Sequence, residues 1–395
     1  MIKLKYSVIA FAALLAPLCL SAQSEVDEVL NVVVRNSARL KAAAERLDYE
    51  KYVNASEKIL EDPEFGFNYL WGQGDEGGIR RDFSVSQSFD LPTLAGVRRG
   101  FAGSLDKMAL IQYESEKVEV LSEARGLCSD IVYYNVLVAA LEEWQKDMQT
   151  LYDATVRRSE LGDAAVLDLA KARLQLSTVR SRLTRARSER LSCLTQLRTL
   201  ADSSSLELTA VEYPGTDIMP DFDAWYSAVM EHDPELRYAA SDMDSKKLQL
   251  KIDKMSWVPK LNVGYMAELG PAEKYRGMTF GISIPIWSNA NKVRSSAAAV
   301  RYAEAQKEAS EQAVRNRLVR TWEEASRLRE VACESRAALA EADPRDALSK
   351  SLSSGAISVL DYILELGMYY DALEQTLLDE KDWRGAWIEL QKYYL

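Results

Sequence analysis

The sequence of 395 residues is poor in the side chains that most often carry catalysis and metal binding. It has one histidine, His232, and four cysteines that lie far apart along the chain. Histidine-based proton transfer and zinc or copper sites need several such side chains close together. We therefore expect neither an enzyme nor a metal or cofactor site.

The chain also lacks an excess of positive charge and a long apolar run. Its 60 acidic residues outnumber 49 basic ones, giving a net charge of -11, so a nucleic acid is not expected as a partner. With 47% apolar and 28% charged residues, the chain is too polar for a helical membrane protein and too apolar for a disordered one. No stretch approaches the ~20 apolar residues that a membrane-spanning helix requires.

The first residues have the pattern of a secretory signal. Two lysines precede an apolar run from about residue 7 to 20, and small residues follow it. We expect residues 1–22 to be removed as a signal peptide. Lipid modification at Cys19 is the alternative, but Leu18 stands where a lipobox has a small residue.

Three cysteines remain after such a cleavage, Cys128, Cys193 and Cys333. All three lie in stretches with helical patterns, and an odd, scattered set argues against a framework of disulfides. We expect them to be small residues that pack between helices.

The chain contains an internal repeat. A shift of 196 positions superposes Asn36–Leu40 on His232–Leu236 and continues without a gap for about sixty residues. Later the shift is 193, and it places Val166–Asp168 on Val359–Asp361. We therefore expect two equivalent halves, 23–202 and 221–395, joined by a linker at 203–220.

The distribution of proline predicts long helices in each half. None occurs between Pro92 and Pro214, and Pro344 is the only one after Pro285. Each half is expected to hold a first helix, two strands and a long helical pair. A helix from about 94 to 148 would be ~80 Å long, which excludes a compact globule. The first helices are expected at about 25–58 and 221–257, and the long ones at about 94–150, 164–202, 290–343 and 356–393.

One of these long helices carries a heptad repeat. Its first seam consists of Leu169, Leu176, Leu183 and Leu197, with Arg190 as the single polar interruption. Its second seam consists of Ala172, Val179, Ala186, Cys193 and Leu200. This period of 3.5 indicates helices packed side by side as in a coiled coil.

Four short segments alternate between apolar and polar residues and are predicted as strands. Their expected bounds are about 62–72, 80–91, 259–269 and 277–287. Their apolar faces carry Phe65, Phe67, Tyr69, Trp71, Phe83, Val85, Phe89, Leu261, Val263, Tyr265, Phe280, Ile282 and Ile284. Each strand is long enough to cross a bilayer at a tilt, although a soluble sheet with one buried face gives the same alternation. Four strands cannot close a membrane barrel, so a barrel would have to be shared between copies.

In its order of elements and its motifs, the sequence resembles the TolC family of outer-membrane efflux proteins over nearly the whole mature chain. The order of helix, strand pair and long helical pair, present twice, carries most of the resemblance. Asp233–Leu236 is similar to the family's Asn-Pro-x-Leu motif, and the tip patterns are Leu161–Ala172 and Ser354–Asp361. The stretches 83–99 and 282–299 that follow the strand pairs are similar too, and in part resemble the heavy-metal efflux branch.

The resemblance implies a fold and a function. The fold is mainly α with a small β part: a homotrimer whose pooled strands form an outer-membrane β-barrel, continued by an α-helical barrel in the periplasm. The function is that of a passive exit duct in a tripartite efflux or type I secretion system. Its partners would be a periplasmic adaptor protein, an inner-membrane pump and the lipid of the outer membrane. Whether metal ions, drugs or polypeptides pass through does not follow.

Site residues are also implied by the resemblance. The tips that would contact the adaptor consist of Leu161, Gly162, Asp163, Ser354, Gly355 and Ala356, and the glycines suit turns that need φ > 0. Asp168 and Asp361 are candidates for an acidic ring in the pore, and a solvated helix face is the alternative for each. The family's gate arginine and tyrosine fall on Ile357 and Leu352 here, and Leu364 stands where a further aspartate is expected. A closed tip would need other contacts.

Two other functions remain open. An exported coiled-coil adaptor or scaffold of the periplasm would hold the same strands in a soluble sheet. An enzyme carried on a helical hairpin would have a deep pocket with coupled ionisable groups.

Overall fold

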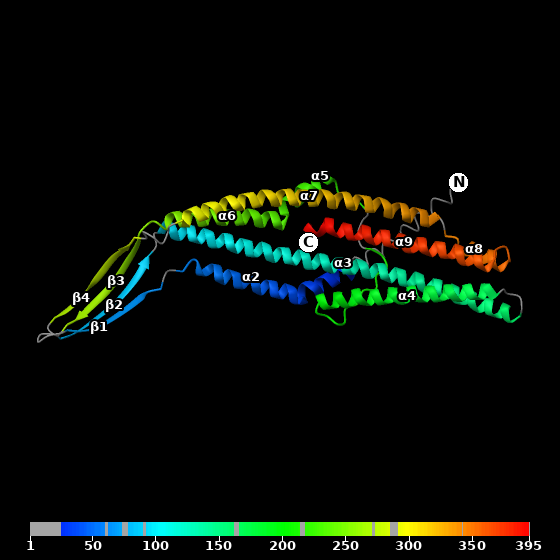
Figure 1. The fold of residues 1–395 in the computed structure, drawn as a ribbon, viewed down its shortest axis with the longest axis horizontal. Helices are drawn as coiled ribbons and strands as arrows, with labels where there is room; N and C mark the ends of the chain where they lie inside the picture. The colour runs from blue at the N-terminus through cyan, green and yellow to red at the C-terminus, as the bar shows by residue number, and fades with distance from the viewer. Residues whose placement is uncertain are drawn as a thin grey trace. The chain divides into compact units, whose positions relative to one another are not determined.

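The computed structural model describes helices that lead into one small sheet (Figure 1). The described residues are 25–59, 62–72, 78–89, 92–161, 166–213, 218–270, 273–284, 291–341 and 343–394. The predicted signal peptide and the tip residues Gly162 and Asp163 lie outside them. Among the described residues, we find no helix with the length and apolar character that crossing a bilayer demands.

The two halves of the chain have the same order of elements. The first half has a helical segment over 25–36 and then α2 (Ala38–Ser56), β1 (Glu64–Trp71), β2 (Ile79–Phe89), α3 (Pro92–Glu160) and α4 (Val166–Leu200). The second half has α5 (Phe222–His232), α6 (Pro234–Met255), β3 (Lys260–Leu269), β4 (Lys274–Ser283), α7 (Lys292–Glu341), α8 (Arg345–Ser353), α9 (Val359–Gln391) and the 3₁₀ turn η1 (Lys392–Tyr394). The short α8 lies where the sequence predicts no element. β4 begins three residues before its expected start, and 285–287 lie outside the described residues.

The first helix of each half is interrupted at the same point of the repeat. In the second half, the buried Asp233 caps α6 by accepting hydrogen bonds from the N–H groups of Glu235 and Leu236, and Pro234 has no N–H to continue the preceding helix. In the first half the break falls at Ser37, whose N–H still bonds to the Val33 carbonyl. Sequence periodicity alone predicts one continuous helix in each case.

By their internal contacts, the residues divide into two units. One unit consists of 43–115 and 230–315, which include the sheet, α6 and the adjoining parts of α2, α3 and α7. The other contains the helical segment 25–36, the remaining parts of α2, α3 and α7, most of α5, and α4, α8 and α9. Two apolar clusters form the core of this second unit, one around Ile131 and Leu197 and one around Trp144 and Leu366.

The buried side chains of α4 confirm the two predicted seams. They include Ala172, Leu176, Val179, Leu183, Ala186, Cys193, Leu197 and Leu200, while Leu169 is half-buried. Cys128 is buried as well, but Cys333 is exposed on α7. The expectation that all three cysteines pack between helices is therefore wrong for Cys333.

The segment expected to be a linker is part of this core. Leu208 is 1% exposed, and it lies in the same apolar cluster as the helical segment 25–36. The side chain of Asn135 on α3 donates to the carbonyls of Leu208 and Ala210, at 3.2 and 2.8 Å. Arg190, which interrupts the seam of α4, donates in turn to the side-chain oxygen of Asn135. The interruption therefore serves to hold the segment that joins the two halves.

Candidate functional site

The sheet is the first candidate region. Its order is β1-β2-β3-β4, all neighbours being antiparallel. Within the described residues β1 and β4 each pair with one strand only, so the sheet has two open edges. β2 leads into α3, and β3 follows α6, so one end of the sheet adjoins helices and the other carries the two hairpin connections (Figure 1).

The register brings most of the apolar side chains of the four strands onto one face, whereas Leu70, Met266 and Tyr275 lie on the other. Residues directly opposite one another share a face, and Phe65, Val85, Tyr265 and Met278 form one such row. All the predicted lipid-facing residues within the strands fall on this face, which we call the apolar face. Ile284 directly follows β4. Most of these side chains are exposed, Trp71 at 74% and Phe65 at 71%, and Val85 and Val263 are half-exposed.

The opposite face, which we call the polar face, carries small side chains. They include Gly66, Ser84, Ser86, Ser88, Asn262, Gly264, Gly277, Thr279, Gly281 and Ser283. A Cβ atom added at Gly264 would lie 2.7 Å from the backbone oxygen of Val85 on β2. The backbone of β2 therefore approaches Gly264 more closely than a residue with a side chain would allow. Glycines with such close approaches occur where a sheet bends.

One arginine joins two carboxylates on the polar face. Arg80 contacts Asp82 through its Nε at 3.0 Å and Glu268 through its Nη2 at 2.7 Å. Asp82 and Glu268 are directly opposite each other on β2 and β3. The pairing with Arg80 reduces the repulsion that two adjacent carboxylates would otherwise have.

The turn between α8 and α9 is the described part of the predicted tips. The N–H of Gly355 bonds to the Leu352 carbonyl, and that of Ala356 bonds to the Ser351 carbonyl, which is the Schellman pattern. Gly355 has φ of +73°, the left-handed conformation for which the sequence predicts a glycine here. Ser354, Gly355 and Ala356 are all exposed.

Asp361 takes part in the start of α9. Its carboxylate accepts hydrogen bonds from the hydroxyl and the N–H of Ser358, and its own N–H donates to the Ser358 hydroxyl, which forms a capping box. These bonds lower the pKa of Asp361. Asp168 lies in the first turn of α4 and is half-exposed. The described tip of the first half ends with Leu161, which is highly exposed.

An arginine that the sequence does not single out lies at the start of α8, the helix that leads to the second tip. Arg345 binds Asp343 at 2.8 Å and Glu143 of α3 at 2.8 Å, and its guanidinium lies 5.3 Å from the centre of the Tyr369 ring. The hydrogen bonds to Asp343 raise the pKa of Arg345. These contacts attach the start of α8 to α3. The one sequence feature that indicates a helix boundary here is Pro344, which directly precedes α8.

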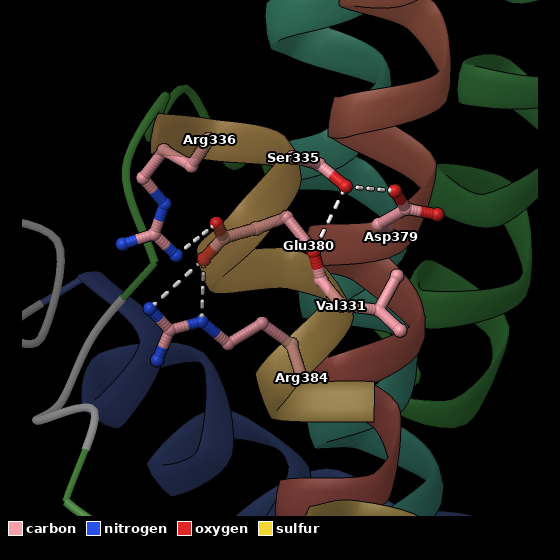
Figure 2. Close-up of polar contacts among 6 residues, drawn as sticks. All are labelled: Val331, Ser335, Arg336, Asp379, Glu380 and Arg384. Atoms are coloured by element: carbon pink, nitrogen blue, oxygen red, sulfur yellow. Dashed lines mark hydrogen bonds and ion pairs between the residues drawn. The ribbon is translucent and has the colours of Figure 1, made fainter. Parts of the chain in front are cut away.

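A second polar cluster joins α7 and α9 in the same unit. Figure 2 shows the Glu380 carboxylate between the guanidinium groups of Arg336 and Arg384, while Ser335 donates to Asp379. Arg384 also lies 5.2 Å from the centre of the Tyr213 ring. The cluster therefore ties the two long helices of the second half to the segment that joins the halves. Within the described part of the chain, no group of three or more His, Cys, Asp and Glu side chains could hold a metal ion.

Comparison with known proteins gives matches among solved structures. No model of a known protein family and no curated protein matches this chain. The open-state MtrE outer membrane channel of Neisseria gonorrhoeae has a TM-score of 0.78 and 13% identity, over 93% of this chain and 88% of that one. The chain has the fold of an outer membrane channel. The outer membrane protein VceC of Vibrio cholerae agrees, with a TM-score of 0.76 and 11% identity over 95% and 96% of the two chains.

This result confirms the predicted fold class, mainly α with a small β part and TolC-like. CusC has a TM-score of 0.72 and 14% identity, over 94% of this chain and 92% of that one. The TM-score of CusC is no higher than those of the other channels, so the resemblance to the heavy-metal efflux branch stays a prediction.

Proposed function

We propose that three copies of this chain form an outer-membrane channel that acts as a passive exit duct in a tripartite efflux or type I secretion system. The observation that carries the proposal is the sheet, which has an exposed apolar face, a polar face of small residues and two open edges. The fold shared with known outer membrane channels supports it.

The open edges require additional strands if the sheet lies in lipid. An unpaired backbone group in hydrocarbon costs several kcal/mol, and membrane barrels contain at least about eight strands. Four strands per chain meet this condition only when copies pool them. The apolar face would then contact hydrocarbon, and the polar face would line a wet lumen.

The tips supply the surface for a periplasmic partner. At the α3–α4 tip, Leu161, Val166 and Leu167 are exposed at 78%, 82% and 61%. Val166 and Leu167 are adjacent in the chain, and neighbouring exposed apolar side chains mark sites of protein association. We assign this surface, with Ser354, Gly355 and Ala356 of the second tip, to an adaptor protein that links the channel to an inner-membrane pump.

Asp168 and Asp361 keep their proposed place in an acidic pore ring. The capping bonds of Asp361 leave its side chain exposed, so three such carboxylates round an axis could still attract cations. Replacing Asp361 by Asn should lower the preference for cations over anions in channel recordings, and an unchanged preference would remove Asp361 from the ring.

Single-channel recording tests the proposal as a whole. The purified protein, added to a planar bilayer, should give discrete current steps and should run as a trimer in detergent. A chain that stays a water-soluble monomer without detergent and gives no current would contradict the proposal and favour the periplasmic scaffold.

A further inference from the structure

The charged residues of the sheet are sorted by face. On the apolar face, the described strands carry three charged side chains, Arg81, Lys274 and Arg276, and all three are basic. The carboxylates of the same strands, Glu64, Asp82 and Glu268, all lie on the polar face. The apolar face therefore has positive charge and no carboxylate of the described strands to balance it.

The three basic residues lie together at one end of the sheet. Arg81 and Lys274 belong to the row that passes through Leu269, and Arg276 lies in the next row, opposite Ala267. Both rows are near the hairpin connections, and all three side chains are exposed. We call these residues the basic girdle. At the helix end the apolar face carries the uncharged row of Phe89, Leu261 and Ile282.

The position of the girdle agrees with the edge of a hydrocarbon layer. From Ile282 to Arg276 is six residues along β4, or about 20 Å at ~3.3 Å per residue. The apolar band of a membrane barrel is about 25 Å tall and its strands are tilted by about 35–45°, so this stretch accounts for about 15 Å of the band. Ile284, which directly follows β4, extends the apolar stretch toward the helix end. Tyr69 shares a row with Arg81, whose guanidinium lies 5.5 Å from the ring centre. Aromatic and basic side chains are typical of the membrane interface.

We propose that the basic girdle binds phosphate groups of anionic lipid headgroups in the leaflet that the hairpin end of the sheet reaches. Guanidinium groups match phosphate in charge and in hydrogen-bond geometry, and among the residues of the described strands no carboxylate competes for them on their own face. The inference rests on the proposed function, because it assumes that the apolar face contacts lipid. The inference adds to the proposed function the chemical class of the lipid, and it says that the hairpin end of the sheet faces the leaflet with the anionic headgroups.

Arg80 supplies a matched control. It is the direct neighbour of Arg81 on β2 but lies on the polar face, where Asp82 and Glu268 bind it. Lys260 also lies on the polar face, at the helix end of the sheet. Removing these two charges changes the net charge of the sheet without touching the girdle.

The experiment compares the full-length protein with two variants in detergent micelles, and native mass spectrometry measures bound lipid. The variants are Arg81→Gln/Lys274→Gln/Arg276→Gln and the polar-face control Arg80→Gln/Lys260→Gln. The probe is bisphosphorylated lipid A, and its dephosphorylated form and inorganic phosphate serve as reference ligands. Each basic residue near an anionic surface changes affinity by roughly fivefold. We therefore expect the girdle variant to bind the probe at least tenfold more weakly, and the control to bind within about twofold of the original chain.

Several outcomes would overturn the inference. They are equal binding of the phosphorylated and dephosphorylated lipids, equal binding by the girdle variant, and displacement of the lipid by millimolar inorganic phosphate. If the girdle variant does not assemble, the variant Arg81→Lys/Arg276→Lys is measured in its place. This variant keeps the positive charges, so it must keep the preference for phosphorylated lipid if the inference is right. A chain that conducts in a bilayer but shows no preference for phosphorylated lipid contradicts this inference alone. A chain that does not conduct contradicts the proposed function, on which the inference rests.

Discussion

In the unit that contains α4 and α9, which we call the helical unit, single polar side chains hold segments that are far apart in sequence. Arg190 breaks an apolar seam, and its hydrogen bond to Asn135 fixes the side chain that holds the segment joining the halves. The Glu380 carboxylate on α9 likewise joins two helices, because it binds Arg336 of α7 as well as Arg384 of α9 (Figure 2). Arg190 looks like an error in a periodic pattern, yet it has a definite partner, and Glu380 has two.

Glu380→Ala should be among the most destabilising single substitutions of the helical unit. The side chains of Glu380 and Arg384 are 14% and 9% exposed, so the substitution removes a carboxylate that binds this buried guanidinium through two of its nitrogens. We expect a loss of about 3–5 kcal/mol in the free energy of unfolding, measured by urea denaturation in detergent. The matched control is Glu323→Ala, because the pair of Glu323 and Arg327 on α7 is exposed and should contribute less than about 1 kcal/mol. Equal losses in the two variants would show that burial does not decide the effect.

Asp147 predicts a change of stability with pH. Burial, followed by the nearby Glu143, raises the pKa of its carboxyl group, while Arg345 acts in the opposite direction. Below the pKa of about 4 that the carboxyl group has in the unfolded chain, its contribution to stability is fully present. This contribution is lost as the pH rises through the higher pKa of the folded state. Asp147→Asn should therefore be more stable than the original chain at pH 7, and the difference should shrink toward pH 4. Urea denaturation at both pH values measures it, and a constant difference would contradict the assignment.

At the scale of elements, glycine has opposite effects at two places in the second half. Gly355 ends α8 with φ of +73°, whereas Gly385 lies inside α9 with no heavy atom within 4 Å of an added Cβ. Gly355→Ala should destabilise the chain by about 1 kcal/mol because alanine is strained in the left-handed region. Gly385→Ala should stabilise it by up to about 1 kcal/mol because alanine favours the helix. Thermal denaturation of both variants tests the pair, and shifts of the same sign would contradict it.

The sheet contains a comparable pair on its polar face. A Cβ at Gly264 would approach the Val85 oxygen to 2.7 Å, whereas at Gly281 the nearest atom would be Asn262 Cβ at 3.6 Å. Gly264→Ala should cost about 1–3 kcal/mol through overpacking and lower the temperature at which the proposed trimer dissociates on a gel. Gly281→Ala should leave that temperature nearly unchanged. If both variants behave alike, the close approach of β2 at Gly264 is not important for the fold.

Periodic features of this fold can be predicted from the sequence, and irregular contacts cannot. The seam through Leu176 and Leu183 follows from a spacing of seven, and the apolar face of the sheet follows from a spacing of two. The burial of Leu208 has no such signal, because the partners of that segment come from distant helices. Arg345 is hidden for the same reason: its partner Glu143 lies 202 positions away.

At the scale of the whole molecule, the open edges of the sheet predict how copies join. In a closed barrel, β1 of one chain lies beside β4 of the next, so cysteines on these edges should form disulfides between chains. A suitable set places one cysteine at Asn68 and the other at Tyr275, Gly277 or Thr279, all on the polar face, in a Cys333→Ser background. The three positions on β4 cover the unknown register, since a disulfide needs Cα atoms within about 7 Å.

Oxidation of at least one of these pairs should give dimers and trimers on a denaturing gel, and nothing larger, because a ring of three closes on itself. The control pair is Ser84→Cys with Met266→Cys, which lie directly opposite each other on β2 and β3 of one chain. These cysteines should react within a chain and leave monomers. A ladder that continues beyond the trimer would mean that the edges form an open chain of copies, and edge pairs that yield only monomers would mean that β1 and β4 do not meet a second copy. Either result contradicts the proposed barrel of three copies, since only a closed ring leaves no strand edge unpaired in lipid.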